Sequence, residues 1–163
     1  HYPLRRQRQM CIRDRTMATT ATISLASADI SGDGLAITNA ATLMKAGTTS
    51  DMVQTTGLAK KTITGNTVGT PVPLVLSAAS NGGAAKVYIA NKSEDPTEYI
   101  NVTIGTSSGQ EIGRLYAGDW LFMPWTQTDA NADILVDASV TTGITLEYMV
   151  IHEVAANNVG INL

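Results

Sequence analysis

The sequence has little of the chemistry on which most enzymes and metal proteins depend. Its 163 residues include a single cysteine, Cys11, and two histidines, His1 and His152. A disulfide framework is excluded, because a bridge within one chain needs two cysteines. A histidine metal cluster or a nucleophile–histidine–acid triad would have to use His152. That residue ends a strand-like run, and we expect it to be a structural histidine.

Long apolar runs and phosphate-binding motifs are missing as well. No run of about 18 apolar residues occurs, so the sequence predicts no membrane span. No apolar stretch follows the first arginines, so it predicts no signal peptide. The pattern GxxxxGK[ST] is absent, and the spacing of Gly65 and Gly69 is typical of a turn, not of a dinucleotide-binding loop.

Residues 1–16 differ from the rest of the chain. They hold Cys11 and five of the eleven basic residues, namely Arg5, Arg6, Arg8, Arg13 and Arg15. The codons for Gln9–Arg15 can be written as a transposon-end adaptor used for short-read sequencing libraries. We therefore expect residues 1–16 to be a disordered, translated adaptor from a metagenomic source, with the native sequence starting at Met17. The alternative is a basic arm that binds nucleic acid.

The net charge of the native chain depends on whether residues 1–16 belong to it. Without residues 1–16 there are six basic and thirteen acidic residues, which gives a net charge of −7. Such a surface repels nucleic acid, and we predict no nucleic-acid partner. An acidic surface is compatible with a protein that is built into a larger assembly.

The composition predicts an all-β protein. Threonine, alanine, valine, isoleucine and glycine dominate, and these favour strands and turns over long helices. Short β-rich runs separated by turn residues predict an antiparallel β-sandwich, jelly-roll-like, over residues 72–152. The expected strands are Val72–Ser77, Ala84–Asn91, Tyr99–Gly105, Glu111–Tyr116, Asp119–Trp125, Asp133–Ala138 and Ile144–His152. Short links such as Ala117–Asp119 suggest that neighbours along the chain pair antiparallel.

The segments on either side of the sandwich are less regular. We expect residues 17–71 to form an extended arm or a small subdomain and residues 153–163 to form a tail. Within the arm the pattern predicts strands at Thr19–Ala26 and Leu35–Thr38, a helical turn at Asn39–Ala46, and irregular or hairpin structure at Gly57–Gly69.

Two groups of acidic residues have types of side chain that could form a metal-binding or catalytic site. Asp29 and Asp33 resemble the start of a calcium loop, but Ala40 occupies the position of the bidentate glutamate, so a turn is the better interpretation. A calcium site completed by other loops stays open. Glu94, Asp95 and Glu98 read as a solvated loop, and nothing in the sequence pairs them across a cleft as a glycosidase requires.

Four aromatic residues within ten positions are the candidate interface or binding residues: Tyr116, Trp120, Phe122 and Trp125. In a strand Trp120 and Phe122 share one face, while Trp125 lies on the other. Because both faces are apolar, we expect burial on both sides, between two sheets or against a neighbouring subunit. Pro124 would mark a strand end or an edge. The alternative is that the tryptophans are exposed and stack on sugars.

Four runs of residues resemble small virion structural proteins of tailed bacteriophages. The runs are Tyr88–Asn91, Glu98–Gly105, Leu115–Trp125 and Ile144–Val150, and the resemblance covers about residues 84–150. It implies a β-sandwich that decorates or cements the capsid, or a neck or tail component. It rests on strands and aromatic residues, and it carries over no catalytic residue.

From these observations we expect a non-enzymatic phage virion structural protein, a capsid decoration or cement protein located in the virion. Its partners would be the major capsid protein or other virion proteins, and it would be a homo-oligomer without membrane or nucleic-acid contacts. We expect no catalytic, cofactor-binding or metal-ligating residues. The alternatives are a carbohydrate- or receptor-binding module of a tail fibre, which would bind a glycan, and a neck or tail component. A hydrolase ranks last.

Overall fold

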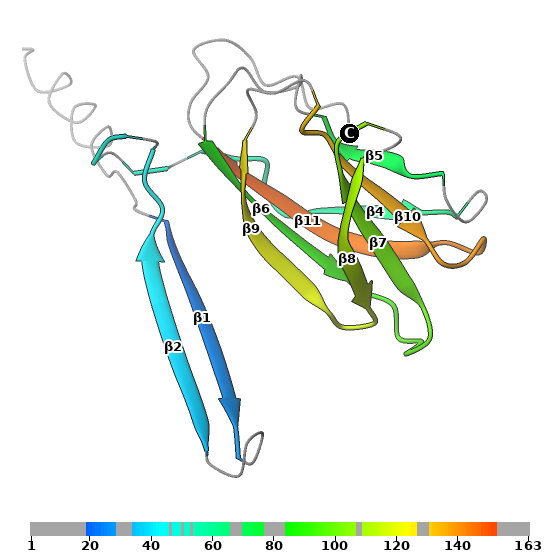
Figure 1. Ribbon diagram of the computed structural model, residues 1–163, viewed down its shortest axis with the longest axis horizontal. Coiled ribbons are helices and arrows are strands. Elements are labelled where there is room, and N and C mark those ends of the chain that lie inside the picture. The colour runs from blue at the N-terminus through cyan, green and yellow to red at the C-terminus, as the bar shows by residue number, and fades with distance from the viewer. Residues whose placement is uncertain are drawn as a thin grey trace, which may run out of the picture. The chain divides into compact units, whose positions relative to one another are not determined.

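The computed structural model describes residues 19–28, 34–45, 47–49, 51–52, 54–65, 70–76, 84–106, 109–126 and 131–152. The chain divides into two compact units, residues 1–53 and residues 54–163. Every regular element in the described ranges is a β-strand, which confirms the all-β prediction (Figure 1). In these ranges no helix is long and apolar enough to cross a membrane.

Several sequence predictions fall outside the described residues. They are the adaptor segment 1–16, the tail 153–163 and the acidic pair Asp29 and Asp33.

The first unit contains a two-stranded hairpin. Its strands are β1 (Thr20–Ser27) and β2 (Leu35–Thr42), which pair antiparallel without a break in register from Thr20↔Thr42 to Ser27↔Leu35. The two predicted strands are therefore present. The predicted helical turn at Asn39–Ala46 is wrong, because Asn39 to Thr42 continue β2 and pair with β1. Pairing with a strand nearly twenty residues away outweighed the weak local helix signal.

Three residues close the open end of this hairpin. The backbone N–H of Leu43 donates to the carbonyl oxygen of Thr19 over 2.8 Å, and the N–H of Met52 donates to the carbonyl oxygen of Leu43 over 2.7 Å. The Thr19 hydroxyl then donates to the carbonyl oxygen of Met52 over 3.1 Å. Leu43 and Met52 are buried, so the base of the hairpin is tied both by hydrogen bonds and by apolar packing.

The second unit is an antiparallel β-sandwich. One sheet has the order β4 (Ala59–Ile63), β11 (Ile144–His152), β6 (Ala84–Asn91) and β9 (Trp120–Thr126), and the short β3 (Gln54–Thr55) also pairs with β11. The other sheet has the order β5 (Val72–Val75), β10 (Ile134–Ala138), β7 (Tyr99–Ile104) and β8 (Gln110–Tyr116). Figure 1 shows β11, in orange, running beside the green β6.

This strand order is that of a jelly roll, as the sequence suggested. From β4 to β11 the chain passes from one sheet to the other at every connection except the one between β7 and β8. The prediction placed the start of the sandwich at residue 72. Because β4 pairs with β11 from Ile63↔Ile144 to Ala59↔Tyr148, residues 59–63 belong to the sandwich too.

The short link Ala117–Asp119 does not join antiparallel neighbours, contrary to the prediction. It connects β8 at the edge of one sheet to β9 at the edge of the other. Gly118 adopts a left-handed φ of 83°, and the N–H of Asp119 donates to the carbonyl oxygen of Tyr116. Asn91 then holds the turn, since its backbone oxygen accepts from Gly118 and its N–H donates to Asp119. The link is a corner of the sandwich.

The core lies between the two sheets and follows the period of two. In β11 the residues from Ile144 to Val150 alternate between buried and partly exposed positions. In β6 the buried positions include Val87 and Ile89, which are fully covered. These side chains pack with Ile100, Val102, Ile134 and Val136 of the opposite sheet in one apolar cluster.

Candidate functional site

The four candidate aromatic residues do not gather at one place. Trp125 lies in the core, whereas Trp120 and Phe122 lie on the outer face of the sheet that contains β9. Tyr116 ends β8 on the outer face of the other sheet, opposite Tyr99. They therefore cannot form a single binding site, although they are close in sequence.

The expected burial of β9 on both sides is correct only for its inner face. Trp125 is 4% exposed, and its indole Nε1 donates to the carbonyl oxygen of Ala132 over 2.6 Å. Trp120, in contrast, is 50% exposed, and Phe122 is partly exposed. The reason is that the other sheet covers only the inner face of β9. β9 is also an edge strand, because it pairs only with β6. Pro124 fits this edge, since it has no N–H for a further partner strand.

The outer side of the sheet carries a row of large apolar side chains across three strands. Tyr88 of β6 lies opposite Phe122 of β9 on one side and opposite Met149 of β11 on the other. Trp120 lies opposite Ala90, one position further along the same outward face. We call Tyr88, Trp120, Phe122 and Met149 the aromatic face. None of the four belongs to the core cluster.

Two members of the aromatic face were not among the predicted residues. Tyr88 alternates with the core residues Val87 and Ile89 along β6, and Met149 alternates with the core residues Tyr148 and Val150 along β11. Both are apolar or aromatic residues on the side of a strand where the alternation calls for polar ones. This departure from the expected alternation could have identified both residues from the sequence.

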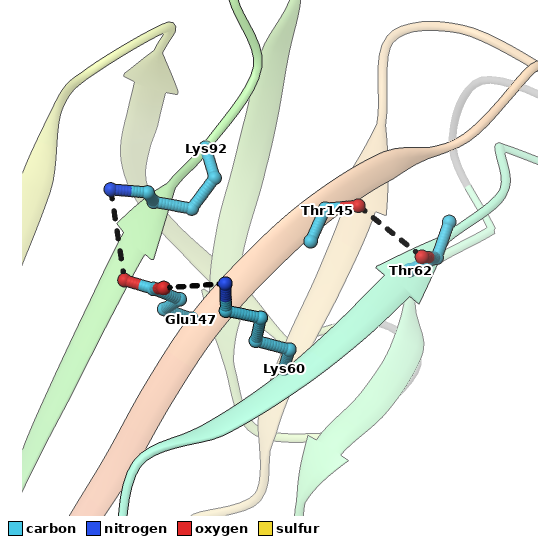
Figure 2. A network of polar contacts seen from close by, with 5 residues as sticks. All are labelled: Lys60, Thr62, Lys92, Thr145 and Glu147. Atoms are coloured by element: carbon cyan, nitrogen blue, oxygen red, sulfur yellow. Dashed lines mark hydrogen bonds and ion pairs between the residues drawn. The ribbon is translucent and has the colours of Figure 1, made fainter.

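A charged group borders the aromatic face on the same sheet. Glu147 of β11 forms ion pairs with two lysines (Figure 2): its Oε1 is 3.2 Å from Nζ of Lys60, and its Oε2 is 3.7 Å from Nζ of Lys92. Glu147 is opposite Ala90 in the register, and Ala90 is opposite Trp120. The same row of the sheet thus runs from Lys60 through a paired carboxylate to the exposed tryptophan.

The neighbouring row continues this polar end of the sheet. The hydroxyl groups of Thr62 in β4 and Thr145 in β11 lie 3.3 Å apart and share a hydrogen bond (Figure 2). The outer side of the sheet is therefore polar where β4 meets β11 and apolar toward β9.

The other sheet presents a smaller group around Tyr116. The rings of Tyr99 and Tyr116 lie 5.4 Å apart, and the guanidinium carbon of Arg114 lies 4.7 Å from the centre of the Tyr99 ring. Arg114 also donates from Nε to the Oδ1 of Asn101 over 3.2 Å. The hydrogen bond with Tyr116, and next the proximity of Tyr99, raise the pKa of the Arg114 guanidinium. The group is a tightly bonded surface patch whose arginine is already engaged.

The acidic loop after β6 is a network of local hydrogen bonds. Asp95 accepts from the N–H of Thr97 over 2.9 Å and from its hydroxyl over 2.7 Å, and these bonds lower the pKa of Asp95. Glu98 accepts from the hydroxyl of Ser93. Asp95 and Glu98 therefore stabilise the loop through these hydrogen bonds. Within the described ranges no group of three histidine, cysteine or acidic side chains could hold a metal ion.

The other catalytic candidate, His152, is buried at the end of β11. It has an interaction partner within the structure. The structural role expected from the sequence agrees with this position.

The hairpin carries a second apolar surface. In its register Ile23 and Leu25 of β1 share one side with Leu35 and Ile37 of β2, and Leu25 lies directly opposite Ile37. We call these four residues the hairpin face. Three of them are exposed: Ile23 by 37%, Leu25 by 51% and Ile37 by 46%. The opposite side of the hairpin carries small polar or alanine residues, among them Ser24 and Thr38, whose hydroxyl oxygens lie 3.4 Å apart.

The described surface thus offers two apolar regions, the aromatic face and the hairpin face. Each is built from strand residues on a regular register. Comparison of the chain with protein-family models, with curated proteins and with solved structures gives no match.

Proposed function

We propose that this chain is a non-enzymatic structural protein of a bacteriophage virion, a capsid decoration or cement protein that binds the major capsid protein through its aromatic face. The observation that carries the proposal is the row of Met149, Tyr88 and Phe122, with Trp120 beside it, on the outward side of a sheet. Large apolar side chains gathered on one outer face are typical of a surface that meets another protein.

The make-up of this surface fits a protein interface. Aromatic residues and methionine are enriched in interface cores, while charged residues are depleted there and collect at the rim. Here Trp120 and Phe122 stand in the apolar part, and Lys60, Lys92 and Glu147 stand at its border. A half-exposed tryptophan is also the side chain that most often carries a large share of the binding energy.

The fold supports the same proposal more weakly. Jelly rolls serve as viral capsid domains, but they also occur in lectins and cupins, so the fold alone does not decide the function. The resemblance of residues 84–150 to small phage virion proteins favours the first of these.

Binding to capsids tests the proposal. Capsids assembled from a major capsid protein sought among the neighbouring genes would be sedimented with the purified chain. We expect the chain to co-sediment, and Trp120→Ala to bind at least about tenfold more weakly, because tryptophan anchors dominate interfaces. Ile112→Ala is the control, since Ile112 is 48% exposed on β8 of the other sheet. Failure of the unaltered chain to bind would contradict the proposal, as would equal binding by Trp120→Ala.

A second candidate function rests on the same tryptophan. A sugar ring can stack on an exposed indole, and Trp120 is 50% exposed, as a carbohydrate-binding module of a tail fibre would require. Glycan-array binding that is lost in Trp120→Ala, with the fluorescence of the buried Trp125 unchanged, would favour this function. Absence of any bound glycan would leave the virion role as the better proposal.

A further inference from the structure

We propose that the hairpin face is covered by the hairpin face of a second copy of this chain. The two copies would form a symmetric dimer through Ile23, Leu25, Leu35 and Ile37. This inference goes beyond the capsid-binding proposal, because it concerns the free protein and a different surface.

The hairpin needs a partner to be stable. A two-stranded antiparallel ribbon is at best marginally stable in water, and three or more strands with a covered apolar face are required. In this hairpin nearly every residue from Thr20 to Thr42 that the structure describes is exposed or partly exposed. The strands are nonetheless eight residues long and pair without a bulge. A regular ribbon with bare isoleucine and leucine side chains indicates a surface that another molecule covers.

The absence of charged residues from the hairpin indicates which kind of surface covers it. Neither β1, TATISLAS, nor β2, LAITNAAT, contains a charged residue. The covering surface must therefore be uncharged too, because burying a charge against apolar side chains without a counter-charge is costly. The aromatic face meets this condition less well, since the charged residues Lys60, Glu147 and Lys86 adjoin it. A second hairpin meets it fully, because neither of its strands carries a charge.

The geometry allows the two hairpins to pack face to face. Two sheets pack with their apolar sides about 10 Å apart, which leaves room for interdigitated isoleucine and leucine side chains. A two-fold axis uses the same patch on both copies, so one self-complementary face is sufficient. The dimer would then have four strands around a small apolar core, with Ser24 and Thr38 still facing water.

Sedimentation of the full chain with paired variants tests the dimer. Ile37→Lys places a charge on the hairpin face, whereas Thr38→Lys places the same charge at the next position, on the opposite side. We expect the unaltered chain and Thr38→Lys to sediment as dimers at micromolar concentration and Ile37→Lys as a monomer. A monomeric unaltered chain would overturn the inference. So would an Ile37→Lys variant that is still dimeric.

Cross-linking locates the contact independently. In a Cys11→Ser background the chain has no other cysteine, so Leu25→Cys introduces a unique thiol on the hairpin face and Ser24→Cys one on the opposite side. A short bismaleimide that spans about 10 Å should link Leu25→Cys into dimers and leave Ser24→Cys monomeric. Equal linkage of both variants would contradict face-to-face packing. Capsid binding depends on Trp120 and can fail or succeed separately, so the two proposals remain distinguishable.

Discussion

The side-chain amide of Asn91 donates to the carbonyl oxygen of Leu115 over 3.0 Å, and this bond joins the two sheets of the sandwich. Asn91 ends β6 in one sheet, and Leu115 lies in β8 of the other. The Oδ1 of the same side chain accepts from the N–H of Ser93 over 2.8 Å. Since Asn91 is only 1% exposed, its amide replaces water for backbone groups at the corner where the chain crosses between sheets.

We predict that Asn91→Ala destabilises the sandwich. Removal of the amide leaves the Leu115 carbonyl and the Ser93 N–H without their partner, and each buried group left unsatisfied costs about 1–3 kcal/mol. Urea denaturation should show a lower midpoint for the variant. Asn101→Ala is the matched control, because Asn101 accepts from the exposed Arg114 and its loss should change the unfolding free energy by less than about 0.5 kcal/mol. Equal stability of both variants would contradict this role.

The two tryptophans should respond differently to the same substitution. Trp125→Phe removes a buried hydrogen bond to Ala132 and part of the core volume, so we expect a loss of about 1–3 kcal/mol in the free energy of unfolding. Trp120→Phe changes a half-exposed side chain and should cost less than about 0.5 kcal/mol. Thermal denaturation monitored by circular dichroism compares the two. A larger effect at Trp120 would argue against the assignment of inner and outer faces.

Gly65 and Gly113 differ in how closely other atoms approach them, so substitution of each by alanine should have a different effect on stability. A Cβ on Gly65 would lie 2.5 Å from the carbonyl oxygen of Ala138 and 2.7 Å from that of Val140, so Gly65→Ala forces the backbone apart. We expect it to destabilise the protein by about 1–3 kcal/mol, as overpacking does. A Cβ on Gly113 in β8 meets nothing within 4 Å, and Gly113→Ala should be neutral or slightly stabilising. Chemical denaturation of both variants measures the difference.

The acidic loop gives a prediction for pH. The hydroxyl of Thr97, followed by its backbone N–H, lowers the pKa of Asp95 below its ordinary value of 3.8. The folded state therefore gains stability that is complete above pH 3.8 and is lost as the pH falls through the lower folded pKa. Thr97→Ala should raise the pKa of Asp95 in an NMR titration. It should not restore the ordinary value fully, because the backbone bond of 2.9 Å remains.

The control for this titration is Thr142→Ala, which alters an exposed turn threonine away from the loop. It should leave the Asp95 titration unchanged. If Thr97→Ala also leaves it unchanged, the hydroxyl bond is not the cause of the lowered pKa.

The strands of the sandwich could be predicted because their signal is local. Ala84–Asn91 and Ile144–His152 have the predicted bounds, since apolar and polar residues alternate along them and turn residues flank them. The continuation of β2 through Asn39 to Thr42 could not be predicted in this way. Its residues give conflicting local preferences, because alanine favours a helix and threonine favours a strand. Pairing with β1 decides their conformation.

The surfaces were harder to predict than the strands. The apolar character on both sides of β9 suggested burial on both sides, but the second sheet covers only the inner face of this sheet, so Trp125 is buried while Trp120 is exposed. The local sequence does not tell which of two apolar faces of a strand meets the opposite sheet. The hairpin face was not predicted either, because only the folded structure shows that Leu25 and Ile37 of the expected arm are exposed on the same side of one hairpin.

The position of β11 in the sheet has a consequence for the order of folding. Hairpin β1–β2 joins residues close in sequence, and such hairpins form in about 1–10 μs. β11 instead pairs on one side with β4, more than eighty residues earlier, and on the other with β6. Folds rich in such distant pairs take about milliseconds to seconds. On the ribosome, β4 must therefore wait as an unpaired strand, and β6 has only β9 as a partner, until residues 144–152 have been synthesised, while the hairpin is already complete.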